Sequence, residues 1–242
     1  EGVNESPTIA GTIVAIIDTG IDLDHPDLNV SEDCWFSAYG PNRVDVDDGN
    51  GHGTHVAGTV AAKANNSTGV RGVAPGATLC PIKVLDKSGS GAWSDIIAGV
   101  DYVTNRRLEF NDGFSDGDAG INIKVANMSL GGCANVVSIW CVAEPPPGNN
   151  SCGVVNGIVE DPLHQAICNS TAVGVVYSVA AGNDGEDALY FVPAAYPEVI
   201  TVSAIADYNG KGGGGAKAPR GCNDGPDDSL ASFSNHGATV AI

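Results

Sequence analysis

The stretch Thr12-Ile13-Val14-Ala15-Ile16-Ile17-Asp18-Thr19-Gly20 decides the fold class. Its first six residues form a continuous apolar and β-branched run, which is typical of a buried strand in a parallel sheet. An ionised Asp at the end of such a strand is unfavourable by several kcal/mol unless it is paired, so we expect Asp18 to be hydrogen-bonded. Taken alone, a turn-forming Asp before a Gly explains the same residues.

Strand-like and helix-like segments alternate along the rest of the chain. Strands that alternate with helices predict a mostly parallel, doubly wound α/β sheet with helices on both faces, and hence three layers. Ligand sites in such a sheet lie beyond the carboxyl ends of the strands. No repeat or linker interrupts the pattern, which predicts a single domain over residues 1–242. We expect strands at 78–85, 121–128, 174–181 and 199–204, and helices at 55–64, 94–105 (with Ser94 as its N-cap) and 163–172.

Composition excludes several classes of protein. Asp and Glu number 29 and Lys and Arg 11, which gives a net charge of −18. Such an acidic chain is a poor ligand for nucleic acid or an anionic membrane surface. No apolar run is long enough to span a bilayer, and no basic-then-apolar leader precedes Glu1, so we expect a mature or trimmed start. The seven cysteines contain no CxxC pair, and their odd number leaves one thiol free or paired outside the chain.

Two further segments carry polar residues next to predicted elements. In Gly51-His52-Gly53-Thr54-His55-Val56-Ala57-Gly58-Thr59, two His residues stand at the start of a helix rich in small residues. A metal site at His52 and His55 is one interpretation, although the Glu of an HExxH motif is absent. Ala180-Ala181-Gly182-Asn183 places an Asn directly after an apolar strand, where an ordinary turn residue is the alternative.

Together these segments resemble the subtilisin-like serine proteases, the subtilases, over almost the whole chain. The resemblance covers six blocks in the order of the family: 17–22 with His25-Pro26-Asp27-Leu28, 51–59, Gly72-Val73-Ala74-Pro75, Asn127-Met128-Ser129-Leu130-Gly131-Gly132, 180–185, and Ala231-Ser232-Phe233-Ser234-Asn235-His236-Gly237.

The resemblance implies a serine endopeptidase that hydrolyses peptide bonds of proteins. It assigns His52 as the general base, Asp18 as the residue that orients it, and Asn183 as the side-chain donor to the oxyanion. The nucleophile of the family lies in a block similar to Gly-Thr-Ser-Met-Ala, which this sequence does not contain. We therefore expect a catalytic domain that is incomplete at its C-terminus and inactive as it stands. The alternative is an inactive, peptide-binding member of the fold, whereas sedolisin-like acid proteases carry Glu in place of His52.

The resemblance also implies a substrate groove, in which the peptide pairs as an added strand between two segments of the chain. The groove residues are Ser88, Gly89, Ser90, Gly91, Trp93, Ser129, Leu130, Gly131, Gly182 and Phe191. Phe191 is expected at the floor of the primary pocket, where its ring favours small or medium apolar substrate residues; its alternative place is the core.

A structural Ca²⁺ site is implied as well, because oxygen ligands of these kinds suit Ca²⁺. We expect the ion to be held by Asp27, Ala64, Asn66, Thr68 and Val70. The resemblance further implies a secreted, extracellular monomer with disulfide bonds, protein or peptide substrates and a possible propeptide. From the charge of the chain we expect no nucleic-acid or membrane partner.

Overall fold

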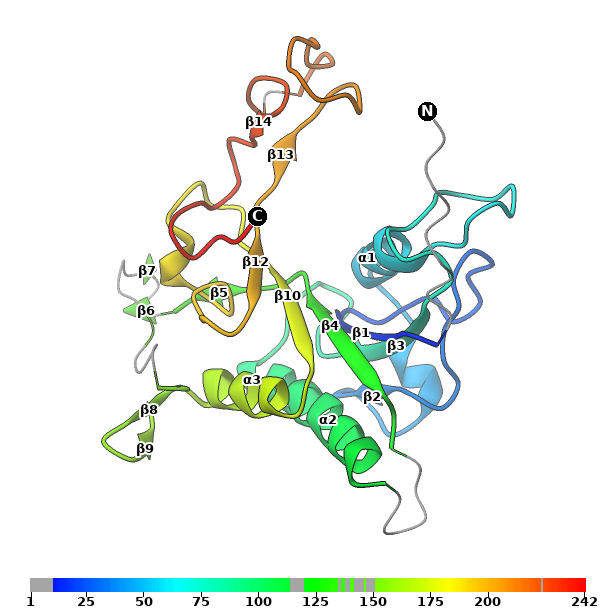
Figure 1. Ribbon diagram of the computed structural model, residues 1–242, viewed down its shortest axis with the longest axis vertical. Coiled ribbons are helices and arrows are strands. Elements are labelled where there is room, and N and C mark those ends of the chain that lie inside the picture. Colours follow the sequence, from blue (N-terminus) through cyan, green and yellow to red (C-terminus); the bar gives the residue numbers. More distant parts are fainter. Residues whose placement is uncertain are drawn as a thin grey trace. The chain divides into compact units, whose positions relative to one another are not determined.

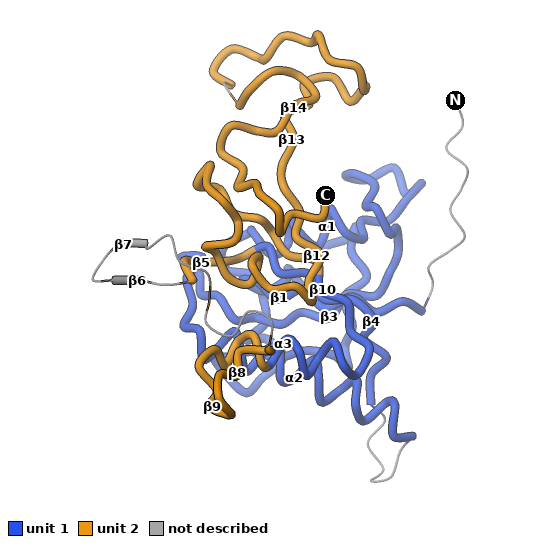
Figure 2. Tube along the Cα trace, turned by 60° about the vertical axis from the view of Figure 1, so that its left-hand side comes forward, with its two compact units in different colours: residues 1–129, 166–177 blue, residues 130–165, 178–242 orange. Residues whose placement is uncertain are grey.

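The computed structural model describes residues 11–113, 120–134, 136–137, 140–141, 146, 151–222 and 224–242. The chain divides into two compact units (Figure 2). Unit 1 comprises Glu1–Ser129 and Ala166–Tyr177, and unit 2 comprises Leu130–Gln165 and Ser178–Ile242. The single domain that the sequence predicts for residues 1–242 stays a prediction.

Parallel strands form the centre of unit 1. β1 (Ile13–Asp18) pairs on one side with β3 (Thr78–Lys83) and on the other with β4 (Ile123–Met128), and β2 (Phe36–Ser37) extends the sheet beyond β3. All three pairings are parallel, and the register sets Asp18 opposite Lys83. The carboxyl ends of β1 and β3 therefore meet at the same edge, where the sequence predicts a ligand site.

Helices cover both faces of this sheet (Figure 1). Because successive residues of a strand face opposite sides, β1 supplies both layers of core. Val14 and Ile16 pack in one cluster with Ala57 of α1 (His52–Ala61). On the other face, α2 (Trp93–Asp112) approaches so closely that a side-chain carbon on Gly99 would lie 2.9 Å from Ile82. Unit 1 thus has the helix–sheet–helix layering expected from the alternating pattern.

The remaining elements of the chain are short, apart from α3 (Pro162–Ala172). A 3₁₀ turn, η1 (Arg43–Val46), precedes α1, and a second, η2 (Ala188–Tyr190), lies in unit 2. β10 (Val176–Ala180) pairs in parallel with β12 (Ile200–Val202). The antiparallel pairs among the described residues are β5 (Gly132–Cys133) with β11 (Phe191–Val192), β6 (Val136–Val137) with β7 (Trp140–Cys141), β8 (Val154–Val155) with β9 (Ile158–Val159), and β13 (Ile205–Ala206) with β14 (Ser229–Leu230).

Each strand and helix expected from the sequence is present, and the differences lie at the boundaries. The first helix begins at His52 rather than His55. The prediction that Ser94 is the N-cap is wrong. α2 begins at Trp93, and its N-cap is Ala92, which has an extended backbone conformation. The same helix continues past Asn105 to Asp112. Its polar last turns are anchored by Arg107, which donates to Val173 O at 3.2 Å and also to Asn122.

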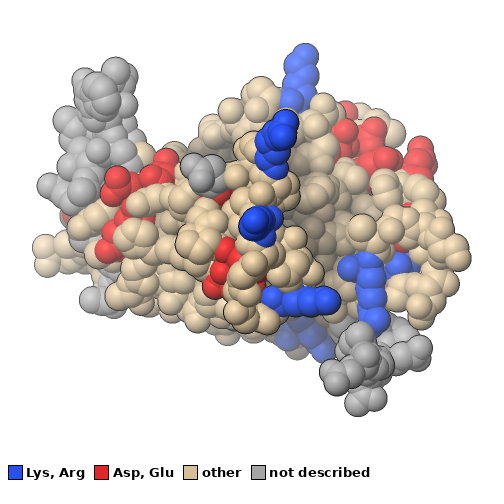
Figure 3. Space-filling model, turned by 90° about the horizontal axis from the view of Figure 1, so that it is seen from above, with Lys and Arg blue, Asp and Glu red and all other residues tan. Residues whose placement is uncertain are grey.

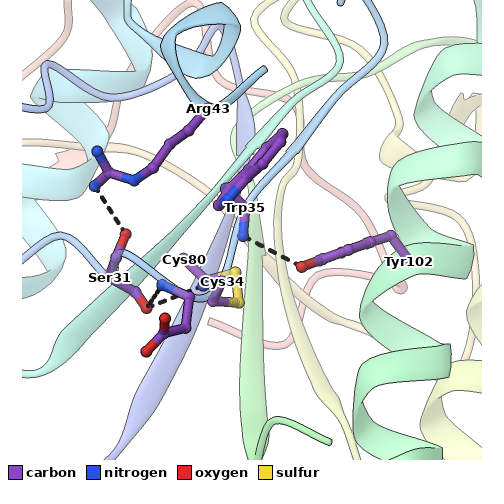
Figure 4. The surroundings of a disulfide bond; sticks show 7 residues. Ser31, Cys34, Trp35, Arg43, Cys80 and Tyr102 are labelled. Atoms are coloured by element: carbon purple, nitrogen blue, oxygen red, sulfur yellow. Dashed lines mark hydrogen bonds between the residues drawn. A yellow bond between two sulfur atoms is a disulfide. The ribbon is translucent and has the colours of Figure 1, made fainter. Parts of the chain in front are cut away.

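A disulfide joins Cys34 to Cys80 of β3, 46 residues apart in the sequence, and both cysteines are fully buried (Figure 4). Hydrogen bonds hold the segment around it, because Trp35 N donates to the Tyr102 hydroxyl at 3.2 Å and Cys34 N to Ser31 Oγ at 3.1 Å. Cys133, Cys152 and Cys168 are disulfide-bonded as well, whereas Cys222 is a free, exposed thiol. Among the helices of the described residues, none combines the length and apolarity needed to cross a membrane.

Candidate active site

Asp18 ends β1 with its side chain fully buried. Its Oδ1 lies 2.8 Å from Nδ1 of His52 and also accepts a hydrogen bond from Thr19 N at 2.7 Å. Within the described residues, Oδ2 has no hydrogen-bond partner. The buried carboxylate is therefore paired, as expected for an Asp in this position, and its partner is a His that lies 34 residues away in the sequence.

His52 is the first residue of α1 and contacts Asp18 through one ring nitrogen only. Its side chain is 48% exposed. When the proton of the neutral ring is on Nδ1 and this N–H donates a hydrogen bond to Asp18, Nε2 carries a lone pair and can accept a proton. The helix start lies tight against the end of β1, since a side-chain carbon on Gly53 would lie 2.1 Å from Gly20 O and 3.2 Å from Asp18 Cβ. Position 53 therefore has room only for a glycine between the start of α1 and the end of β1.

Two residues at this edge of the sheet have roles that the sequence analysis did not assign. Asp48 accepts hydrogen bonds from Thr19 Oγ1 at 2.9 Å and from Thr54 Oγ1 at 2.6 Å. Lys83 is buried and donates to Thr19 O, and to Asp47 O at 3.2 Å. Burial lowers the pKa of Lys83, and neighbouring carboxylates, Asp48 first, oppose this effect. Two features of the sequence could have indicated these roles: Asp48 shortly precedes a helix start, and Lys83 ends a buried strand.

Asn183, the expected oxyanion donor, is exposed in the loop that follows β10. A second Asn holds this loop within unit 2. Asn235 is fully buried, and its Oδ1 accepts hydrogen bonds from Asp184 N at 2.9 Å and Glu186 N at 3.1 Å. Its Nδ2 donates to Ala181 O at 3.0 Å. Asn235 belongs to one of the six family-like blocks, but nothing in that block alone indicates this contact.

The expected groove residues lie on several loops and strand ends. Ser88–Gly91 are exposed and follow β3, in a turn in which Asp86 Oδ1 accepts hydrogen bonds from Ser88 N at 2.7 Å and Ser90 N at 3.2 Å. Trp93 is 41% exposed at the first turn of α2. Ser129 follows β4 and receives a hydrogen bond from Asn127 Nδ2 at 3.0 Å. In unit 2, Leu130 and Gly182 are half-buried, Gly131 is exposed, and Phe191 is buried in β11.

The expected calcium ligands lie close together in unit 1. Asp27 is 2% exposed, and its carboxylate accepts from Asn66 Nδ2 at 2.5 Å and Val70 N at 3.3 Å. Ala64 and Thr68 belong to the same loop as Asn66 and Val70. In that loop alternate residues, Asn65, Ser67 and Gly69, have positive φ angles of 60°, 59° and 58°.

The model of the subtilase family matches residues 10–242, and the chain belongs to that family. Its relatives include subtilisin E of Bacillus subtilis, 38% identical over 199 residues, which cover 81% of this chain and 41% of subtilisin E. Subtilisin Savinase of Lederbergia lenta is 35% identical over 239 residues, 99% of this chain and 65% of that protein. The solved structure of a cold adapted subtilisin-like serine proteinase is 28% identical, with a TM-score of 0.58 over 95% of this chain and 61% of its own.

These similarities confirm the family and the α/β class that the sequence predicts. The chain spans between 41% and 65% of the length of these two curated relatives. The roles of the individual site residues stay predictions, as do the ion and the substrates.

Proposed function

We propose that the protein is a serine endopeptidase in which Asp18 and His52 are two members of the catalytic triad. The observation that carries the proposal is the 2.8 Å contact between the buried Asp18 carboxylate and Nδ1 of His52 at the carboxyl end of β1. Family membership supports it, because relatives named subtilisin share 35–38% of their aligned residues with this chain.

The pair acts on a serine hydroxyl. Asp18 accepts a hydrogen bond from Nδ1–H and thereby keeps the lone pair of His52 on Nε2. Nε2 takes the serine proton as the oxygen attacks the peptide carbonyl, and the resulting imidazolium, stabilised by Asp18, returns the proton to the leaving amine. The serine is expected in a block similar to Gly-Thr-Ser-Met-Ala, which is not among these 242 residues. Asn183 is proposed to donate its side-chain amide to the tetrahedral oxyanion.

The proposed substrates are extended peptide segments of proteins outside the cell. Ser88–Gly91 of unit 1 are exposed, and Trp93, two residues further on, offers an apolar surface. Gly131 of unit 2 is exposed as well. Phe191 is proposed to limit the primary pocket to small or medium apolar side chains. Secretion, a propeptide and a monomeric state belong to the same proposal, and the disulfides are compatible with an oxidising compartment.

We further propose that the loop 64–70 and Asp27 hold a Ca²⁺ ion. Asp27 is a buried carboxylate without an ion-pair partner among the described residues, and a cation would compensate its charge. The alternating left-handed residues repeat every second position, as do the proposed ligands Ala64, Asn66, Thr68 and Val70. The Asn66 amide presents its NH₂ group to Asp27. Rotation of this amide by 180° would place its oxygen there instead, as a Ca²⁺ ligand, and the two orientations have nearly the same shape. The ion would supply stability rather than chemistry.

The triad is tested in the natural polypeptide that carries these residues together with the serine block. Asp18→Asn is expected to lower kcat for a chromogenic peptide about 10⁴-fold, because His52 then takes the wrong tautomer. His52→Ala should lower it at least as far. The matched control is Asp24→Asn, which changes an exposed Asp between β1 and α1. Retention of more than about a tenth of the activity in Asp18→Asn would overturn the role of Asp18.

A further inference from the structure

The carboxylate of Asp48 accepts five hydrogen bonds in unit 1. Oδ1 receives them from Thr19 Oγ1 at 2.9 Å, Asn50 N at 3.0 Å and Gly51 N at 2.9 Å. Oδ2 receives them from Thr54 N at 2.9 Å and Thr54 Oγ1 at 2.6 Å. A carboxylate offers about four lone-pair sites, so both oxygens are fully engaged.

The partners of Asp48 adjoin the two members of the proposed triad. Thr19 directly follows Asp18, and its N–H donates to the same Asp18 oxygen that His52 contacts. Thr19 Oγ1 also accepts from Gly53 N at 2.9 Å, in the residue after His52. Gly51 and Thr54 lie on either side of His52 in the first turn of α1. One side chain therefore links the end of β1 to the start of α1.

The position also suits a permanent negative charge. Partial burial raises the pKa of Asp48, but hydrogen bonds from Gly51, Thr54 and Asn50 outweigh it and lower the pKa to about 2. The unpaired N–H groups at a helix N-terminus favour an anion at this place. Gly51, the N-cap residue of α1, has no side chain to satisfy them, so Asp48 does so from three residues earlier.

We propose that Asp48 is a positioning residue for catalysis, which fixes the first turn of α1 against the end of β1 and so sets the Asp18–His52 hydrogen bond. The proposal rests on the proposed function, since it gives Asp48 a task only if that pair is the catalytic base. The His52 ring is half exposed, so contact with Asp18 and the place of its own backbone determine where it lies. Without Asp48, the hydroxyl of Thr19 and the N–H groups of the helix start lose their common acceptor.

The test uses the 242-residue chain itself and a readout that needs no activity. A ring N–H that donates to a carboxylate gives a proton resonance far downfield in the NMR spectrum. His164 Nε2 lies 2.7 Å from Glu198 Oε2 and can give a second such resonance, so the His52 resonance is identified as the one that is lost in Asp18→Asn. The variants are Asp48→Asn, Thr19→Val and Thr19→Ser. The matched control is Asp47→Asn, which removes the same charge one residue earlier. Among the described residues, the Asp47 carboxylate accepts one hydrogen bond, from Leu23 N at 3.3 Å.

The expected result is a resonance in the wild type that is lost or broadened in Asp48→Asn and Thr19→Val. It should persist in Thr19→Ser, which keeps the hydroxyl, and in Asp47→Asn. Circular dichroism identifies a variant that fails to fold, and Thr19→Val then tests the link without changing a charge. A resonance that survives unchanged in both folded variants overturns the role of Asp48 and leaves the Asp18–His52 pair standing. If the wild type lacks the resonance and Asp18→Asn changes nothing, the pair itself is wrong and the proposed function falls with it.

Kinetics provide the second arm, in the natural polypeptide that contains the serine block. A displaced base slows chemistry and leaves substrate binding intact, so Asp48→Asn should lower kcat about 10²-fold at unchanged KM. Asp47→Asn should change neither constant. A rise in KM of about 10²-fold at unchanged kcat would mean that Asp48 acts in substrate binding, which contradicts the proposal.

Discussion

At the scale of single residues, Asp48 determines part of the acid stability of the protein. Its pKa lies at about 2 in the folded chain and at 3.8 for the unperturbed group. The folded state thus binds fewer protons than the unfolded state between these values, and stability falls as the pH drops through this window. The stabilisation by Asp48 is fully present above about pH 4.

We therefore expect Asp48→Asn to be less stable than the wild type at pH 7, with a smaller loss of stability between about pH 4 and pH 2. The measurement is urea denaturation followed by tryptophan fluorescence at several pH values. Asp47→Asn serves as the control and should follow the wild-type curve. Parallel curves for Asp48→Asn and the wild type across the window would contradict the low pKa of Asp48.

At the scale of elements, the loop 64–70 is expected to depend on calcium. A ligand that binds only the folded state stabilises it by mass action, by about 2.7 kcal/mol at a hundred times its Kd. Chelation should therefore lower the melting temperature of the wild type. Asp27→Asn should melt at the lower temperature with or without chelator. Asp24→Asn is the matched control and should keep its response, and an unchanged wild-type melting temperature at low salt would argue against the ion.

The bridge between Cys34 and Cys80 is expected to stabilise the crossover from β1 to β3. A disulfide restricts the unfolded chain, and its removal typically lowers the free energy of unfolding by about 2–4 kcal/mol. The double variant Cys34→Ala/Cys80→Ala should lose stability in this range, measured by urea denaturation without reductant. Cys222→Ala, which removes a free and exposed thiol, is the control. Equal midpoints for the double variant and the wild type would contradict a stabilising role.

Sequence patterns predicted the elements that have a strong period or composition. The apolar run of β1 and the small-residue helix α1 are of this kind, and they bring Asp18 next to His52. The far end of α2 was not predicted, because its last turns are polar and depend on contacts of Arg107 with residues distant in the sequence.

The hydrogen-bond role of Asp48 was not predictable either. An Asp in the turn Asp48-Gly49-Asn50-Gly51 has the same local sequence whether it is solvated or accepts a bond from Thr19. Only the closure of β1 against α1 distinguishes these alternatives. The contacts of the Asn235 side chain were not predictable for the same reason, because its partners lie about fifty residues earlier and are all backbone groups.

At the scale of the whole molecule, charge is the dominant property. The formal charge is −18, and Figure 3 shows groups of Asp and Glu side chains on one face, with Lys and Arg side chains among them. A large charge of one sign destabilises the compact state through self-repulsion. Salt screens this repulsion, since the Debye length falls from about 30 Å at 0.01 M to about 3 Å at 1 M.

We expect the melting temperature to rise with sodium chloride at pH 7, in the presence of chelator so that calcium does not contribute. The control is the same titration near the isoelectric point of about 4.3, where the net charge vanishes and the rise should disappear. A rise of equal size at both pH values would show that salt acts by a route other than charge screening.

The position of the Cys34–Cys80 bridge has a consequence for the protein when a protease cuts its backbone. The bridge encloses residues 35–79, and this span contains His52, Asp48 and the stretch 65–70, whose residues are all exposed. Exposed loop tips are preferred sites of proteolytic nicking. A cut there would leave two fragments tethered through sulfur, visible as separate bands only after reduction, and the two halves of the crossover would stay together after the backbone is broken.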